Sequence, residues 1–482
     1  MSRSLLQEQL EACAAARYPL HMPGHKRRYA PAPGLSCAAW DTTEVPGTDD
    51  LHDADGILAD AMARAAALWG SRRCWFLVGG STCGLLAAIR AAAPYGSEIL
   101  CARNCHKSVY HAIELGNLRP VWLTPPVDPV FGVYGSITPA MVAEALAAHP
   151  KAACVVLTSP TYEGVLSDIA AIADLCHARG IPLVVDEAHG AHYMPAAAPY
   201  GWQGGAVAAG ADLVVQSAHK TLPSLTQTAL LQLNGTLIDP DEVERQLDVF
   251  ETSSPSYPLM VSLDGCVTQM AQDGPALFAG WRARLDRFSA AVAPLKHLRV
   301  LCHGTDALDG HPDFFAHDSG KILVNGAAAG LTGAAMARIL RETYGFETEM
   351  ACGYSLLAMT SVCDAEDALD RLADALLAMD ATARPDTVPA APGLCPPGEA
   401  MCTIAEAVRL PRQELPLPET VGRTAAEYVW AYPPGVPLIA PGEQVTPDFV
   451  SACAVLEMAG TALHHTVAKT PGALAVCADS KP

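Results

Sequence analysis

Between residues 70 and 235 the sequence alternates short apolar runs with longer helix-like segments, and this alternation constrains the fold more than any other feature. The apolar runs predict strands at 74–78, 98–101, 121–123, 153–157, 181–186, 211–216 and 228–233. The segments 83–93, 107–115, 139–148 and 168–179 predict the helices between them. Strands without polar alternation must be covered on both faces. The pattern therefore predicts an α/β fold, in which a mostly parallel sheet carries helices on both faces.

Length and composition predict more than one domain. The chain has 482 residues, 50% of them hydrophobic and 17% charged, so it can bury more than one core. A stretch rich in proline and alanine predicts a linker at 381–393. We predict an N-terminal arm at 1–60, a large domain at 61–265, a smaller α/β domain at 266–380 and a C-terminal domain at 394–482.

Charge and cysteine usage exclude several classes of partner and compartment. The net charge of −20 argues against nucleic acid, whose phosphates require basic patches. No uncharged apolar run approaches the roughly 20 residues of a membrane span. The 16 cysteines form no Cys-x-x-Cys pair, and the N-terminal region has acidic residues where a secretory apolar core would lie. We therefore expect a cytoplasmic protein with reduced thiols that contacts neither nucleic acid nor membrane.

Two charged residues end apolar runs thirty-four positions apart. Lys220 closes the run that begins at residue 211, and Asp186 closes the run that begins at residue 181. Taken singly, they could be a solvated lysine and a helix cap. As a pair, an amine and a carboxylate at the ends of two core strands are what a pyridoxal phosphate (PLP) enzyme needs. The lysine forms the Schiff base, and the carboxylate keeps the pyridine nitrogen protonated.

Other polar residues also follow predicted strands. Residues 79–82 (Gly-Gly-Ser-Thr) lie between a strand and a helix, where they could hold a phosphate at the helix N-terminus or simply cap the helix. His106 could stack on a flat cofactor ring or be an ordinary histidine at a helix start. In parallel sheets, ligands bind beyond the carboxyl ends of the strands. We therefore expect Asp186, Lys220, Ser81 and His106 to converge on one crevice.

Residues 186–189 read Asp-Glu-Ala-His and suggest two other classes of protein. Helicases and NTPases carry these letters, but the phosphate loop Gly-x4-Gly-Lys-Ser/Thr is missing from this sequence. A metal hydrolase using Asp186, His189 and His192 is the alternative from a different class. Its two histidines follow a strand rather than lying on a helix that presents both rings to zinc. We therefore expect no metal site.

Several longer motifs, in order along the chain, resemble the PLP-dependent ornithine/lysine/arginine decarboxylases of fold type I, the aminotransferase-like architecture. The motifs are HMPGHK (21–26), GTDDL (47–51), GST (80–82), RNCHKS (103–108), SPTYEG (159–164), DEAHG (186–190), SAHKT (217–221), YPPG (432–435) and PGE (441–443). The chain resembles the shorter, biosynthetic-type members, because it has no room for the N-terminal wing domain of the larger ones. The resemblance implies that the large domain, 61–265, binds PLP.

The resemblance also implies a role for each matching residue. Lys220 would carry the cofactor, Asp186 would pair with the pyridine nitrogen, and His106 would stack on the ring. Either Lys220 or His219 would reprotonate Cα of the substrate. The cofactor-binding set would comprise Ser81, Thr82, His106, Asp186, Ala188, His189, Ser217, His219 and Lys220. Since fold type I sites are built at a dimer interface, a homodimer or a higher homo-oligomer is expected.

The implied reaction is decarboxylation of a basic amino acid. Arginine, lysine or ornithine would yield agmatine, cadaverine or putrescine together with carbon dioxide, and the sequence does not choose among them. The acidic residues Asp49, Asp50, Asp53 and Asp55 could meet the distal cation of the substrate or form a solvated loop. Another fold type I reaction, transamination or elimination, is the main alternative. A non-enzymatic relative that keeps PLP for regulation is a further one.

Overall fold

The computed structural model describes residues 4–16, 37, 39–301, 308, 310–384, 397–431, 435–458 and 461–478. The motif at 21–26, most of the predicted linker and residues 432–434 lie outside this part of the chain. The chain forms two compact units. The first comprises Met1–Ala92 and Ile169–Trp281, and the second comprises Ala93–Asp168 and Arg282–Pro482.

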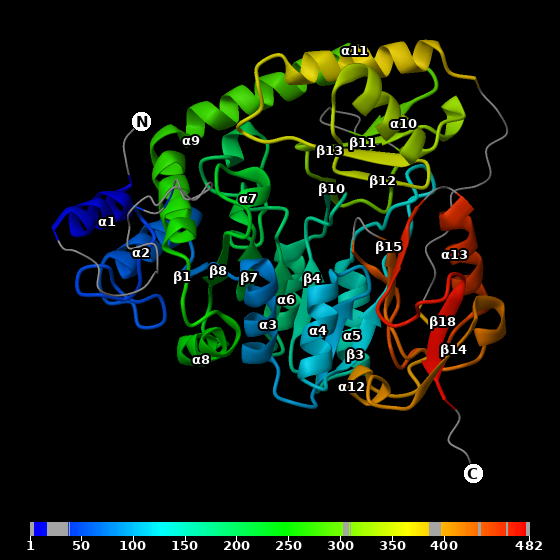
Figure 1. The fold of residues 1–482 in the computed structure, drawn as a ribbon, viewed down its shortest axis with the longest axis horizontal. Coiled ribbons are helices and arrows are strands. Elements are labelled where there is room, and N and C mark those ends of the chain that lie inside the picture. Colours follow the sequence, from blue (N-terminus) through cyan, green and yellow to red (C-terminus); the bar gives the residue numbers. More distant parts are fainter. Residues whose placement is uncertain are drawn as a thin grey trace. The chain divides into compact units, whose positions relative to one another are not determined.

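A seven-stranded, mostly parallel sheet confirms the predicted α/β class (Figure 1). The strand order is β1-β8-β7-β6-β4-β2-β3. The first unit supplies β1 (Arg73–Leu77), β6 (Leu183–Asp186), β7 (Leu213–Gln216) and β8 (Ala229–Leu233), and the second supplies β2 (Glu98–Ala102), β3 (Arg119–Leu123) and β4 (Val155–Thr158). β8 runs antiparallel to both β1 and β7, whereas β6 is parallel to β7, and β2 is parallel to β3 and β4. Every predicted strand overlaps one of these seven.

The helices of the first unit connect and cover its strands. They are α1 (Leu5–Ala16), α2 (Ile57–Trp69), α3 (Gly80–Ala92), α6 (Ile169–His177), α7 (Ala218–Thr221), α8 (Pro240–Phe250) and the start of α9 (Tyr257–Val292). Apolar residues of α1, α2 and α9 form a core cluster with Val78, which directly follows β1. This packing holds the end of β1 in place. The long helix α9 continues without a break past residue 265, where the predicted large domain ends, and the five-part domain division stays a prediction.

The second unit adds two helices beside its three strands of the large sheet, and then a series of small antiparallel sheets. The helices here are α4 (Lys107–Leu115) and α5 (Pro139–Ala148). Thr138 caps α5 by accepting a hydrogen bond from the Met141 amide, and Pro139 occupies the first turn. The small strands are β5 (Val165–Leu166), β9 (Arg299–Leu301), β10 (Ala316–His317), β11 (Lys321–Asn325), β12 (Met350–Cys352) and β13 (Ser355–Met359). Two of them form the pair β10-β5, and the other four form a sheet in the order β12-β13-β11-β9.

The C-terminal part of the second unit has its own core. Its elements are α10 (Gly333–Ile339), α11 (Ala368–Ala381), α12 (Ile404–Ala407), β14 (Arg412–Pro416), β15 (Val429–Ala431), β16 (Pro437–Ile439), α13 (Pro447–Met458), β17 (Leu463–His465) and β18 (Ala473–Cys477). Phe449 and Leu456 of α13 pack against Ile439, Leu474 and Val476. The elements from α12 onward carry the orange and red colours of Figure 1, and α10 and α11 are yellow-green to yellow.

Among the described residues, no helix combines the length and the apolar composition that crossing a membrane requires.

Candidate active site

Three strands of the first unit deliver polar residues to the same edge of the sheet. β6 and β7 are parallel, and β1 has the same direction because both β1 and β7 are antiparallel to β8. Residues 80–82 follow β1, residues 188–189 follow β6, and residues 217–220 follow β7. The carboxyl ends of parallel strands are where such sheets bind ligands.

Lys220 lies in the short helix α7, directly after β7. Its Nζ atom is 2.9 Å from Nε2 of His189, which follows β6. Because an ammonium group can only donate, Nε2 of His189 accepts this hydrogen bond. The structure therefore brings together the predicted Schiff-base lysine and one of the residues predicted to line the cofactor ring.

Asp186 is the last residue of β6, and only 3% of its surface is exposed. Its Oδ1 atom accepts a hydrogen bond of 3.1 Å from the amide of Ala188. Burial raises the pKa of Asp186, while the positive charge of Lys220 and the bond from Ala188 act in the opposite direction. The carboxylate is thus buried at the edge of the sheet, where a cationic ligand atom would stabilise its ionised form.

Two neighbours of Lys220 complete this group. Ser217 is fully buried, and within the described part of the chain its Oγ atom has no hydrogen-bond partner. A buried hydroxyl without a partner leaves room for a hydrogen bond to a ligand or to a bound water. His219 donates from Nδ1 to the carbonyl of Thr228 over 2.8 Å. Burial lowers the pKa of His219, and the charge of Lys220 lowers it further, against the effect of the bond to Thr228.

Ser81 and Thr82 lie in the first turn of α3, which begins immediately beyond β1. Gly80, at the start of the helix, has a φ of +77°, a conformation that side chains disfavour. The turn lets the helix present its N-terminal amides at the edge of the sheet. Amides at a helix N-terminus together with two hydroxyls form a donor set that suits a phosphate.

His106 belongs to the second unit, at the carboxyl end of β2. It is the N-cap of α4, and its Nδ1 atom accepts a hydrogen bond of 3.3 Å from the amide of Ser108. The structure therefore gives His106 the helix-start role that the sequence left open. Stacking of its ring on a cofactor stays a prediction.

The two histidines of the metal-hydrolase alternative have different surroundings. His189 contacts Lys220, whereas His192 is fully buried, with ring-centre distances of 4.6 Å to Tyr193 and 5.2 Å to Trp281. Across the described ranges, no group of three or more His, Cys, Asp and Glu residues is arranged to hold a metal ion. His192 therefore belongs to an aromatic cluster of the core.

Glu187 has a role that the sequence did not reveal. It is 1% exposed, and its two oxygens accept hydrogen bonds of 2.7 Å from the Ala206 amide and from Nε2 of Gln216. Burial raises its pKa to about 8. Glu187 thus ties the end of β6 to β7 and to the loop at residue 206, and so supports Asp186 beside it.

The acidic run near residue 50 is in part structural. The carboxylate of Asp49 accepts hydrogen bonds from the amides of Leu58 and Gly56, at 2.8 and 3.0 Å, and so caps the start of α2. Asp50 accepts one from the amide of His52. The Asp49 carboxylate therefore has a structural role. This favours the interpretation of Asp49 as part of a loop over a contact with the distal cation of the substrate.

A mostly parallel α/β sheet with a lysine, a buried carboxylate and an unpaired buried hydroxyl at its edge fits the class of fold type I PLP enzymes. Residues 19–310 match the family described as "Orn/Lys/Arg decarboxylase, major domain", and residues 370–472 match "Orn/Lys/Arg decarboxylase, C-terminal domain". The chain belongs to the Orn/Lys/Arg decarboxylase family. It is therefore a PLP-dependent lyase that decarboxylates a basic amino acid.

Two curated relatives cover almost the whole chain. The arginine decarboxylase of Halalkalibacterium halodurans is 32% identical over 443 residues, which cover 88% of this chain and 87% of the relative. The arginine decarboxylase of Bacillus subtilis is 31% identical over 454 residues, covering 91% and 90%. Among solved structures, the lysine decarboxylase of Francisella novicida has a TM-score of 0.81 at 19% identity, over 98% of this chain and 81% of that chain. This last similarity shows the fold alone.

Proposed function

We propose that this chain decarboxylates arginine and releases agmatine and carbon dioxide. One observation supports the choice of substrate. Two arginine decarboxylases are 31–32% identical to the chain over about nine-tenths of both sequences, so the relationship includes the regions outside the cofactor motifs. The sequence motifs by themselves leave lysine and ornithine open.

In this proposal the edge of the sheet in the first unit holds the cofactor. Lys220 would bind it covalently, Asp186 would hold its protonated ring nitrogen, and Ala188 and His189 would line the ring. Ser81, Thr82 and Ser217 would donate to the phosphate, and His219 would lie beside it. PLP, when bound, supplies an electron sink for the electron pair that stays on Cα as carbon dioxide departs.

The contacts of the first unit favour Lys220 over His219 as the acid that returns a proton to Cα. Nδ1 of His219 is committed to the Thr228 carbonyl, and the lowered pKa keeps this imidazole neutral near pH 7. Its Nε2 atom is then an acceptor rather than a donor. The amine of Lys220 carries protons to donate, and its hydrogen bond to His189 orients it.

We further propose that the active form is a homodimer or a larger homo-oligomer in the cytoplasm. The assembly follows from the family resemblance, since fold type I sites are built at a dimer interface. Reduced thiols support the compartment, because the described cysteines form no disulfide.

The test is an assay of the purified, PLP-loaded protein with arginine, lysine and ornithine in parallel, in which carbon dioxide and the amine product are both quantified. We expect agmatine from arginine, with kcat/KM at least about tenfold above that for the other two amino acids. Faster formation of cadaverine or putrescine would overturn the choice of arginine. Keto acid without carbon dioxide would overturn decarboxylation itself.

A further inference from the structure

The loop between β1 and α3 is held by a carboxylate from another part of the chain. Glu251 directly follows α8 and is 8% exposed. Its Oε2 atom accepts hydrogen bonds from the amides of Val78, at 3.1 Å, and Gly79, at 3.0 Å. These amides immediately precede the first turn of α3, which carries Ser81 and Thr82. Glu251 therefore binds the loop through the amides of Val78 and Gly79.

Gly79 makes this close approach possible. A Cβ atom at residue 79 would lie 2.8 Å from Oε1 of Glu251 and 2.9 Å from Cβ of Cys83. Any other residue would push the carboxylate or the helix away. The glycine thus serves the contact with Glu251 and not only the flexibility of the loop.

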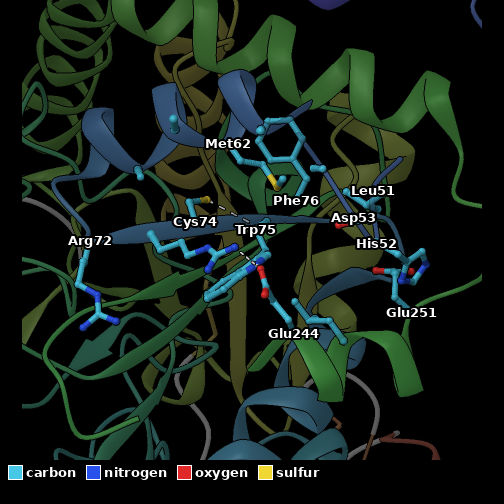
Figure 2. Close-up of a pocket in the computed structure, with 16 residues that line it drawn as sticks. Leu51, His52, Asp53, Met62, Arg72, Cys74, Trp75, Phe76, Glu244 and Glu251 are labelled. Atoms are coloured by element: carbon cyan, nitrogen blue, oxygen red, sulfur yellow. Dashed lines mark hydrogen bonds and ion pairs between the residues drawn. The ribbon is translucent and has the colours of Figure 1, made fainter. Parts of the chain in front are cut away.

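Glu251 is itself held in place through Thr252, which in turn binds His52. Its Oε1 atom accepts a hydrogen bond of 3.1 Å from the amide of Thr252, and Nε2 of His52 donates to the carbonyl of Thr252 over 2.9 Å. Figure 2 shows Glu251 and His52 together at one end of a pocket whose residues come from the segment 51–54, α2, β1 and α8. The backbone of Thr252, next to Glu251, is therefore hydrogen-bonded at both its amide and its carbonyl.

Gln227 binds the same peptide of the loop from the other side. The Nε2 atom of Gln227 donates to the carbonyl of Val78. Val78 is therefore bound at its amide by Glu251 and at its carbonyl by Gln227. Gln227 has a φ of +86°, a conformation that is costly for a residue other than glycine and that clusters at functional sites. The next residue, Thr228, accepts the hydrogen bond from His219. Gln227 thus links the loop to the segment that carries Lys220.

We propose that Glu251 and Gln227 are positioning residues that clamp the Val78 peptide and set the phosphate donors of α3 relative to Lys220. The carboxylate occupies the amides of residues 78 and 79, so a bound phosphate is left with the first turn of α3 and its two hydroxyls. This inference rests on the proposed phosphate-binding role of Ser81 and Thr82.

The test compares two cofactor forms that differ only in the phosphate. Dissociation constants of PLP and of phosphate-free pyridoxal are measured by titrating the cofactor-free protein and following the absorbance of the bound ring. For Glu251→Gln and for Gln227→Gly, we expect the Kd of PLP to rise at least about tenfold, because hydrogen bonds that orient the phosphate site are lost. We expect the Kd of pyridoxal to change by less than about twofold.

Glu244→Gln is the matched control. Glu244 lies on the same helix α8 and accepts hydrogen bonds from Arg73 and Trp75 of β1 (Figure 2). This variant should keep the wild-type ratio of the two constants. Gln227→Gly keeps the test decisive if Glu251→Gln does not fold, since glycine adopts the φ of residue 227 without strain.

Two outcomes separate this inference from the proposed site. A wild-type protein with no preference for PLP over pyridoxal would overturn the phosphate site itself. A wild-type preference that both variants retain in full would overturn the clamp and leave the phosphate site intact.

Discussion

Nζ of Lys220 and Nε2 of His189 are 2.9 Å apart, although the two residues follow different strands, β7 and β6. The strands are parallel neighbours, with Asp186 paired to Val215, so residues just beyond their ends meet. The charge of Lys220 also acts on Asp186, whose pKa it lowers against the effect of burial. One lysine therefore interacts with the residue predicted to pair with the ring nitrogen and with one of the residues predicted to line the ring.

Replacement of this lysine should abolish the reaction. We expect Lys220→Ala to lower kcat by at least about a thousandfold, as loss of a covalent catalytic group typically does. Borohydride reduction followed by mass spectrometry should trap PLP on the wild-type protein and not on the variant. The exposed Lys151→Ala should behave as wild type in both measurements. A Lys220→Ala protein that traps the cofactor would place the attachment elsewhere.

Asp186→Asn should lower catalysis without unfolding the protein. An amide of the same shape can no longer stabilise a protonated ring nitrogen, so we expect kcat to fall by roughly 10²–10³ while the folded state persists. Steady-state kinetics and thermal unfolding measure the two effects. Asp174→Asn, on the exposed side of α6, is the control. Unchanged kcat in Asp186→Asn would show that this carboxylate does not serve the ring.

His317 should make the protein sensitive to acid. Burial lowers its pKa to about 4, and its Nε2 atom donates to the Glu163 carbonyl at 3.0 Å. The unfolded chain, with a histidine pKa near 6.5, binds the proton first as the pH falls, so stability is lost between about pH 6.5 and 4. Protonation of His317 in the unfolded chain should lower the free energy of unfolding by on the order of 1–2 kcal/mol between pH 7 and 5.

His317→Gln keeps a side-chain donor but cannot be protonated in this range. The variant should lose less stability than wild type when urea unfolding at pH 7 and pH 5 is compared. His149→Gln, at a partly exposed histidine that pairs with Glu98, is the matched control for the loss of one histidine. Equal acid sensitivity of wild type and His317→Gln would assign the effect to other groups.

A buried ion pair should stabilise the second unit. Arg103 and Glu443 are 1% and 4% exposed, and the atoms Nη2 and Oε2 are 3.1 Å apart. Glu443→Ala leaves a buried guanidinium without its partner, so we expect a loss of about 3–5 kcal/mol in the free energy of unfolding. The exposed Glu457→Ala is the control.

A double variant tests the reason for this loss. If the cost arises from the unpaired charge, Arg103→Met combined with Glu443→Leu should recover most of the stability in urea unfolding. A double variant as unstable as Glu443→Ala would instead show that the effect comes from the hydrogen bond between the Ala440 amide and the Glu443 carboxylate, which both variants lack.

Local patterns were sufficient for much of the fold. Each apolar run between 70 and 235 forms a strand, because a continuous run of Val, Leu and Ile is buried whichever face it presents. Asp186 and Lys220 could be selected because they directly follow such runs. Glu251 and Gln227 could not, since they lie 173 and 149 residues from Val78, to which they bind. No periodicity or composition marks contacts of that separation.

The sequence by itself determined the alternation of strands and helices and which polar residues follow the strands, because both depend on neighbours a few positions away. Its motifs also determined the family. The tertiary structure decided which of these residues meet. It placed His189 on Lys220, committed Asp49 to the cap of α2 and buried His192 among aromatic rings. These outcomes depend on strand order and packing, which arise only when distant segments are brought together.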